Sequence, residues 1–276
     1  MTVRQLLADG RARLGATAFA SSREAHLLLG HVLGWGEASV LARDDAEVSE
    51  PDAARFAALI ERRVAGEPIA YLVGSKEFFG RSFLVDRRVL VPRPETEHLV
   101  EAAIALVGSL PARPRILDLG TGSGCIAVTL ALEIAGSRVV ATDRSPAALA
   151  VARANARALG ARVEFVAAEW TSPLRVDGFD LVVSNPPYLD PVGPVMPEVA
   201  AWEPPGALWA GPRGLVAYEA LLAGLATLRP GTALLLELGF GQASAVGALA
   251  ERHGFRVQAV AADLAGIERV LSLQRR

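Results

Sequence analysis

The chain has 276 residues, which suits one large domain plus a small one, or a single broad α/β unit, and allows a sizeable buried core. Hydrophobic residues make up 51% of it and charged residues 21%, a composition that excludes an extensively disordered chain. The 28 basic and 30 acidic residues leave a net charge of -2, so no overall positive field would draw nucleic acid from a distance.

Cysteine and histidine usage argues against disulfides and metal sites. Cys125 is the single cysteine, so no internal disulfide can form, and the four histidines lack metal-ligand spacing. Residues 1–10 lack the apolar segment of a signal peptide, and charged residues interrupt the later apolar runs before they reach spanning length. We therefore expect a metal-free protein of the cytoplasm.

The first seventy or so residues have the apolar spacing of helices. Ser21 and Glu24 resemble a capping box and predict a helix that starts there and ends at Gly34. A second helix is predicted to start at Ser49 and to stop at Gly66. None of these residues suggests catalysis.

The pattern then changes to short β-type runs. Phe78-Phe79 and Phe83-Leu84-Val85 flank Gly80-Arg81, which predicts a hairpin with its turn at those two residues. We expect this hairpin to link two domains.

From Arg115 onward, short apolar runs alternate with helical stretches, which is typical of a parallel, doubly wound α/β sheet. The predicted strands are residues 116–119, 138–142, 163–166, 181–184, 233–237, 256–260 and 269–273.

A glycine-rich turn follows the first of these strands and predicts a cofactor site. Its residues are Gly120, Thr121, Gly122, Ser123 and Gly124, and glycines let the backbone pass close to a ligand. Asp118 would repel a pyrophosphate but could hold a cationic amino-acid group, or else it is a carboxylate satisfied within the turn. Asp143, after the next strand, is at the right distance to accept ribose hydroxyls, or else it caps the following helix. Together these residues favour an adenosyl ligand without phosphates.

Asn185-Pro186-Pro187-Tyr188 follows the fourth strand, at the sheet edge where α/β proteins bind ligands. Prolines stiffen the chain and leave carbonyl oxygens that only accept hydrogen bonds. We expect the Asn185 side-chain oxygen and the Pro186 carbonyl to accept from the NH2 group of a planar substrate, with Tyr188 stacked on it. A bare proline-rich turn is the simpler alternative. Trp170 either contacts the adenine of the adenosyl ligand or packs in the core.

These residues resemble the class I methyltransferases, and nearly the whole chain resembles the release factor glutamine methyltransferase family, called PrmC or HemK. The matching segments are Gly66–Leu72, Glu77–Gly80, Val91–Glu97 and Asn185–Tyr188. The sequence departs at Glu169, where we expect aspartate before the Trp170 position.

The resemblance implies a fold, an activity and a set of partners. The fold would be a seven-stranded, Rossmann-like methyltransferase domain at residues 93–276, with a helical substrate-recognition domain at 1–75 and a β-hairpin linker at 76–92. The activity would be transfer of the methyl group of S-adenosylmethionine to the glutamine N5 of the Gly-Gly-Gln loop in class 1 peptide chain release factors. The chain would act as a monomer, without a membrane or sequence-specific nucleic acid.

It also implies which residues form the site. The cofactor would contact Gly120–Gly124, Asp143, Trp170 and Asn185, and the glutamine would contact Asn185–Tyr188. Arg93 and Glu95 would position the substrate loop, or they would lock the hairpin to the catalytic domain.

Four alternatives remain open from the sequence. The same motif could methylate the amino group of an extruded nucleic-acid base, although the net charge argues against it. A ribosomal-protein glutamine is a second acceptor. A noncatalytic binding module and a nicotinamide-dependent dehydrogenase are further alternatives, of which the second conflicts with Asp118 beside the glycine turn.

Overall fold

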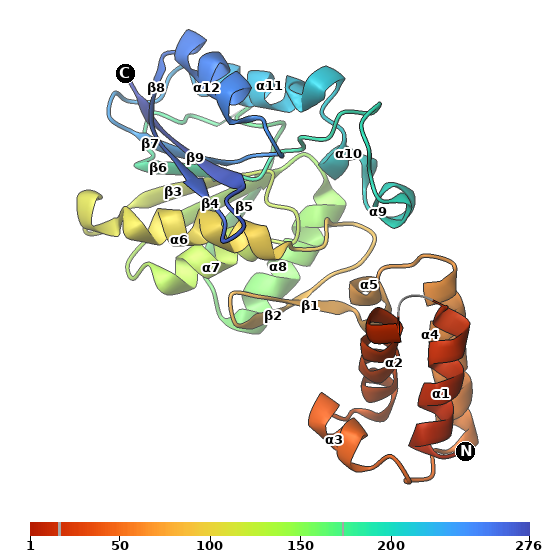
Figure 1. Ribbon diagram of the computed structural model, residues 1–276. Coiled ribbons are helices and arrows are strands. Elements are labelled where there is room, and N and C mark those ends of the chain that lie inside the picture. The colour runs from red at the N-terminus through yellow and green to blue at the C-terminus, as the bar shows by residue number, and fades with distance from the viewer. Residues whose placement is uncertain (16–17, 173) are drawn as a thin grey trace. The chain divides into compact units, whose positions relative to one another are not determined.

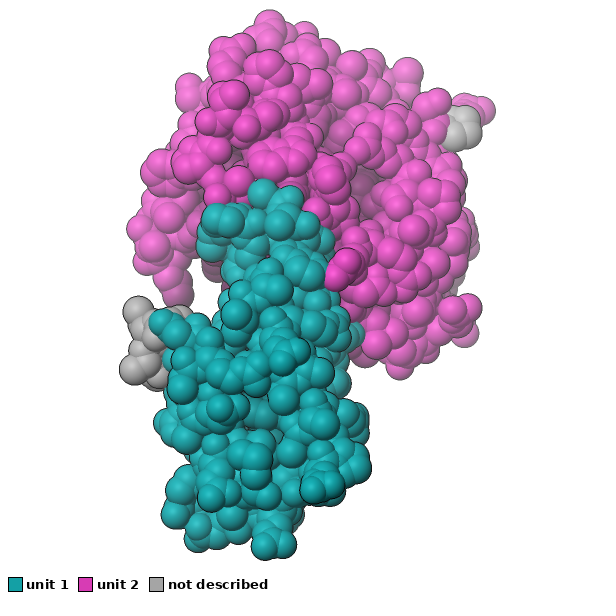
Figure 2. Space-filling model, turned by 90° about the vertical axis from the view of Figure 1, so that its right-hand side faces the viewer, with its two compact units in different colours: residues 1–75, 196–202 teal, residues 76–195, 203–276 magenta. Residues whose placement is uncertain are grey.

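The computed structural model describes residues 1–15, 18–172 and 174–276, and the chain forms two compact units (Figure 1). Met1–Ser75 and Met196–Trp202 make up the N-terminal unit; Lys76–Val195 and Glu203–Arg276 make up the sheet unit. Figure 2 colours the first teal and the second magenta. No helix of the described residues is long and apolar enough to cross a membrane.

The N-terminal unit is helical. Its helices are α1 (Val3–Leu14), α2 (Ala18–Leu33), α3 (Glu37–Ala42), α4 (Glu50–Val64), α5 (Ile69–Val73) and α9 (Pro197–Trp202). Leu28, Leu29, Phe56 and Ile60 are almost fully buried in its core. Arg63 joins separate parts of the unit, because it pairs with Glu24 at 2.9 Å and with Glu198 at 2.7 Å.

The predicted start of α4 is confirmed, but that of α2 is wrong. Ser49 caps α4 by accepting from the backbone N–H of Asp52. Helix α2 begins at Ala18, so Ser21 lies inside it, where it is buried. The Glu24 carboxylate pairs with Arg63 and not with a backbone N–H at a helix start. The prediction failed because a serine and a glutamate three residues apart also occur inside helices.

The hairpin consists of β1 (Ser75–Phe78) and β2 (Arg81–Leu84), and its turn is Phe79-Gly80 rather than the predicted Gly80-Arg81. Both turn residues have positive φ, 51° and 70°, as the twist of a two-residue hairpin requires. The strained Phe79 is held because its N–H donates to Glu97 Oε1 at 2.9 Å. This contact cannot be read from local sequence.

The sheet unit contains a seven-stranded sheet in the order β5-β4-β3-β6-β7-β9-β8. The strands are β3 (Arg115–Leu119), β4 (Arg138–Asp143), β5 (Val163–Ala167), β6 (Leu181–Ser184), β7 (Ala233–Glu237), β8 (Phe255–Ala262) and β9 (Glu268–Arg275). All seven predicted strands are confirmed, but β9 runs antiparallel to β7 and β8. The five residues between β8 and β9 are too few for the crossover that parallel strands need.

Helices cover both faces of this sheet (Figure 1). One face carries α6 (Glu97–Ala105), α7 (Cys125–Glu133) and α8 (Pro146–Leu159); the other carries α11 (Val216–Gly224) and α12 (Ala243–Arg252). The shorter elements are α10 (Pro205–Leu208) and the 3-10 turns η1 (Pro94–Thr96), η2 (Val107–Ser109) and η3 (Pro212–Gly214).

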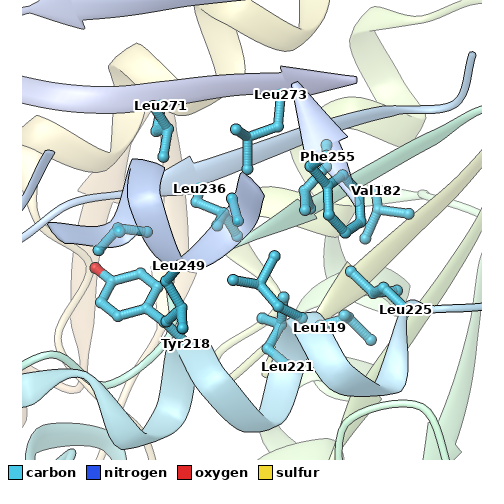
Figure 3. Close-up of a cluster of buried hydrophobic side chains, with 14 of the residues drawn as sticks. Leu119, Val182, Tyr218, Leu221, Leu225, Leu236, Leu249, Phe255, Leu271 and Leu273 are labelled. Atoms are coloured by element: carbon cyan, nitrogen blue, oxygen red, sulfur yellow. The ribbon is translucent and has the colours of Figure 1, made fainter. Parts of the chain in front are cut away.

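Successive strand residues serve opposite cores, because side chains of a strand alternate between the two faces. Leu181 and Val183 of β6 pack with α6 and α7, whereas Val182 packs with α11 and α12. Figure 3 shows the second of these cores, in which Val182 lies next to Phe255, with Tyr218 and Leu221 of α11 in the same cluster. Burial on both faces explains why these strands read as continuous apolar runs.

Candidate functional site

Three chemically important residues follow three neighbouring strands at the same sheet edge. Leu119 of β3 lies in register with Thr142 of β4 and with Ser184 of β6. In the order β5-β4-β3-β6-β7, the strands that follow β3 are added first on one side of it and then on the other. Such a switch point opens a crevice for ligands. Gly120 and Asn185 come directly after β3 and β6, and Asp143 is the last residue of β4.

The glycine turn is pinned to Asp143. The N–H of Gly122 donates to Asp143 Oδ2 at 2.9 Å, and the N–H of Ser145 donates to Asp143 Oδ1 at 2.9 Å. Ser145 itself caps α8, accepting from the N–H of Ala148, so the helix-cap alternative for Asp143 is wrong. The Asp143 carboxylate thus fixes the turn that it adjoins.

Gly124 has a packing role behind the turn. It ends the turn at φ +82° directly before α7, and a Cβ there would lie 3.0 Å from Ala152 Cβ. Only glycine lets α7 pack this closely on α8.

Asp118 is fully buried below the glycine turn. Its Oδ2 accepts from the Thr121 hydroxyl at 2.6 Å, while its Oδ1 is buried without a hydrogen-bond partner. Burial raises the pKa of Asp118 to about 7, and the negative charge of Asp143 adds to the rise that the Thr121 hydrogen bond opposes. A buried carboxylate with an unused oxygen suits a cationic ligand group.

A cavity of about 520 Å³ opens at this edge, a volume typical of small-molecule sites. Of the predicted site residues, it is lined by Gly120, Gly122, Asp143, Trp170, Asn185 and Pro187. The residues outside its lining are Arg93, Glu95, Asp118, Thr121, Ser123, Gly124, Pro186 and Tyr188. The open backbone of the two glycines and the Asp143 carboxylate line the cavity and fit an adenosyl amino acid such as S-adenosylmethionine, while Asp118 lies buried outside the lining.

Trp170 packs in the core, as one alternative predicted, and its contact with an adenine stays a prediction. It lines the cavity and also packs against the apolar core that contains Leu119. Its backbone has φ +51°, and its carbonyl accepts from the Thr142 hydroxyl at 3.2 Å. The neighbouring Glu169 lines the same cavity, with Arg144 3.7 Å away.

The Asn185–Tyr188 segment continues β6 into the cavity wall. Asn185 Nδ2 donates to the hydroxyl of Thr96 at 3.1 Å, and Pro186 is buried. The Tyr188 carbonyl accepts from Gln242 Nε2 at 3.1 Å. Burial raises the pKa of Tyr188 to about 12, so its phenol is neutral at physiological pH.

Arg93 and Glu95 do not act as a pair. Arg93 forms an ion pair with Glu203, a buried residue that also accepts from the N–H of Val91 at 3.0 Å. Glu95 is partly exposed and lies 3.9 Å from Arg269. The Arg93 contact supports the alternative that it locks the segment after the hairpin, because its guanidinium is already engaged.

Two polar residues beside Asn185 had no predicted role. Thr96 is 2% exposed, and Glu237 at the end of β7 is 2% exposed. Glu237 could have been found from its place at the carboxyl end of the strand beside β6. Thr96 lies within the Val91–Glu97 match to the family, but local sequence gives no reason for its contact with Asn185. Among the described residues, no cluster of three or more potential metal ligands occurs.

Comparison with known proteins gives consistent matches. Residues 5–74 match the model of the PrmC N-terminal domain, and residues 96–196 match the methyltransferase small domain. The chain is 46% identical to a release factor glutamine methyltransferase of Burkholderia pseudomallei, over 89% of both chains. It is 43% identical to one of Moorella thermoacetica, over 100% of this chain and 99% of that one.

A solved structure shares the fold. It is a T. thermophilus 16S rRNA methyltransferase in complex with AdoMet and guanosine, similar with a TM-score of 0.51 at 21% identity. The likeness covers 73% of this chain and 50% of that one.

Proposed function

The chain belongs to the release factor glutamine methyltransferase family, and from this premise we propose that it methylates the side-chain N5 of the glutamine in the Gly-Gly-Gln loop of peptide chain release factors. It is an enzyme that uses S-adenosylmethionine. The release factor, the glutamine and the residues that act on them are the proposed part.

One observation carries the proposal: Asn185 lines the same cavity as Gly120, Gly122 and Asp143. The glycine turn and the Asn185–Tyr188 segment, the latter through Asn185 and Pro187, therefore border one cavity, although Asn185 lies 65 positions after Gly120 in the chain. Proximity of two reactants held in one cavity can supply a large share of a rate enhancement.

The cofactor would be held by the residues at the end of β3 and β4. Asp143 would accept from its ribose hydroxyls, Asp118 would attract its ammonium group, and Trp170 would cover its adenine. When bound, its sulfonium supplies an electrophilic methyl group.

The acceptor amide would be held by oxygens. An amide nitrogen is a weak nucleophile because its lone pair is delocalised. Asn185 Oδ1 and the Pro186 carbonyl would each accept one hydrogen of the glutamine NH2, which turns that nitrogen toward the cavity. As positive charge grows on the nitrogen, the two oxygens would stabilise it, and the methylated nitrogen would then lose its excess proton to water, so no strong base is required. Tyr188 would stack on the planar amide.

We assign residues 1–75 to recognition of the release factor, residues 76–92 to the linker and residues 93–276 to catalysis. The chain would work as a monomer in the cytoplasm, where release factors act. Arg93 would lock the segment after the hairpin through Glu203, and Glu95 would position the glutamine loop.

The test is methyl transfer from labelled S-adenosylmethionine to a purified release factor, compared with the same factor whose loop glutamine is replaced by alanine. We expect label in the first only, and equal label in both rejects the acceptor. Asn185→Ala should abolish transfer with an unchanged circular dichroism spectrum. Normal turnover of that variant rejects the pocket, and label found instead in ribosomal protein or in RNA would identify the rival acceptor.

A further inference from the structure

The Asn185 amide is held from inside the protein by two buried residues. Its Nδ2 donates to Thr96 Oγ1 at 3.1 Å, where Thr96 joins η1 to α6. Glu237 ends β7, and Ser184 of β6 lies in register with Leu236 of β7. Asn185 and Glu237 are therefore the next residues along two adjacent parallel strands.

The chemistry of these neighbours decides which end of the amide faces inward. A carboxylate accepts hydrogen bonds and donates none, and the Thr96 hydroxyl that accepts from Asn185 keeps its own proton to donate. Thr96 and Asn185 act as side-chain donors that oppose the rise in the pKa of the Glu237 carboxyl, which fits this arrangement. Glu237 Oε2 remains buried without a partner, so the site has more acceptors than donors. An Asn185 oxygen turned inward would meet only acceptors on the carboxylate side.

We propose that Thr96 and Glu237 are positioning residues that fix the Asn185 amide with its NH2 inward and its Oδ1 toward the acceptor. The inference rests on the proposed function, because it explains how the same pocket selects its substrate. An Oδ1 that faces the cavity attracts the NH2 of glutamine and repels the carboxylate of glutamate. Thr96 and Glu237 act through Asn185 and need no contact with the substrate.

The protonation of Glu237 should then affect turnover. Burial raises the pKa of Glu237 to about 7, and hydrogen bonds from Thr96 and Asn185 limit the rise. Above this pH the ionised carboxylate accepts from both neighbours, and below it the added proton makes one oxygen a donor. The titratable and charged groups that face it are Glu95, Arg269, Tyr188, Tyr218 and Cys125. We expect kcat to rise from pH 6 to pH 8.

Thr96→Val removes the hydroxyl but keeps the shape of the side chain. We expect kcat for the release factor to fall about tenfold, while the Kd of S-adenosylmethionine measured by calorimetry stays within about twofold. Thr96→Ser should restore kcat. The matched control is Thr129→Val on α7, because Thr129 is fully buried and its hydroxyl has no partner. Unchanged kcat in Thr96→Val, or an equal fall in the control, overturns the inference.

Glu237→Gln tests the second positioning residue without relying on Thr96. Its kcat should fall and lose the rise between pH 6 and pH 8, and a persisting rise with normal kcat contradicts the role of Glu237. A readout independent of the acceptor is hydrogen exchange of the Asn185 side-chain NH2, assigned by NMR with Asn185→Ala. We expect exchange to accelerate at least about tenfold in Thr96→Val, as an amide freed from a buried partner would. Unaltered exchange refutes the inference whichever acceptor is methylated.

Discussion

Gly124→Ala should destabilise the sheet unit strongly, because two effects coincide at that position. Gly124 has φ +82°, which an L side chain adopts at a cost of about 1–2 kcal/mol. The added methyl group would also lie 3.0 Å from Ala152 Cβ and 3.2 Å from Ala152 Cα, and overpacking of this kind costs about 1–3 kcal/mol. The sum is a loss of roughly 2–5 kcal/mol in the free energy of unfolding.

Gly122→Ala is the matched control. Gly122 has φ +54° in the same turn, but a Cβ there would meet no atom within 4 Å. Its stability should fall only by the backbone cost of about 1–2 kcal/mol. Because Gly122 lines the cavity, this variant should instead bind S-adenosylmethionine more weakly.

Urea unfolding followed by circular dichroism measures both variants, and calorimetry measures cofactor affinity. A double variant with Ala152→Gly should recover part of the Gly124→Ala loss, since it removes the Cβ at 3.0 Å. Ala152→Gly alone costs about 1 kcal/mol of helix propensity, which the double-mutant cycle accounts for. Equal destabilisation by Gly122→Ala and Gly124→Ala, with no coupling to Ala152, would refute the packing argument.

Three further predictions concern buried polar groups and the acceptor pocket. The folded pKa of Asp118 lies above its unfolded value, so its stabilising contribution is complete below about pH 4 and disappears as the pH rises through about 7. Asp118→Asn should therefore reduce the loss of unfolding free energy between pH 6 and pH 8 by about 1 kcal/mol, and an unchanged pH dependence in urea titrations contradicts this. Glu203→Ala should lower the free energy of unfolding by about 3 kcal/mol in the same titrations, because it leaves the Val91 N–H and Arg93 without their carboxylate. A loss no larger than that of an exposed ion pair would show that the pair is dispensable. Tyr188→Phe should keep methyl transfer within about twofold, because stacking needs only the ring, and abolished transfer would assign a function to the hydroxyl.

Local sequence determined most of the sheet and the residues that line its edge. Runs such as Leu181–Ser184 are apolar because both faces of the sheet are buried, so their boundaries follow from composition alone. Polar or glycine residues directly after such runs, Gly120 and Asn185 among them, must lie at the carboxyl edge of a parallel sheet. The place of the candidate site in the fold could therefore be predicted from the sequence.

Contacts between distant segments decided the rest. The Phe79 turn depends on Glu97, and the inner setting of Asn185 depends on Thr96, 89 residues earlier in the chain. The segment Met196–Trp202 belongs to the N-terminal unit through partners such as Arg63, which no local pattern indicates. The apolar pattern of a sequence indicates which side chains are buried, because each buried position favours an apolar residue. Which two polar groups share one buried hydrogen bond depends on how the chain folds back on itself, and only the tertiary structure contains that information.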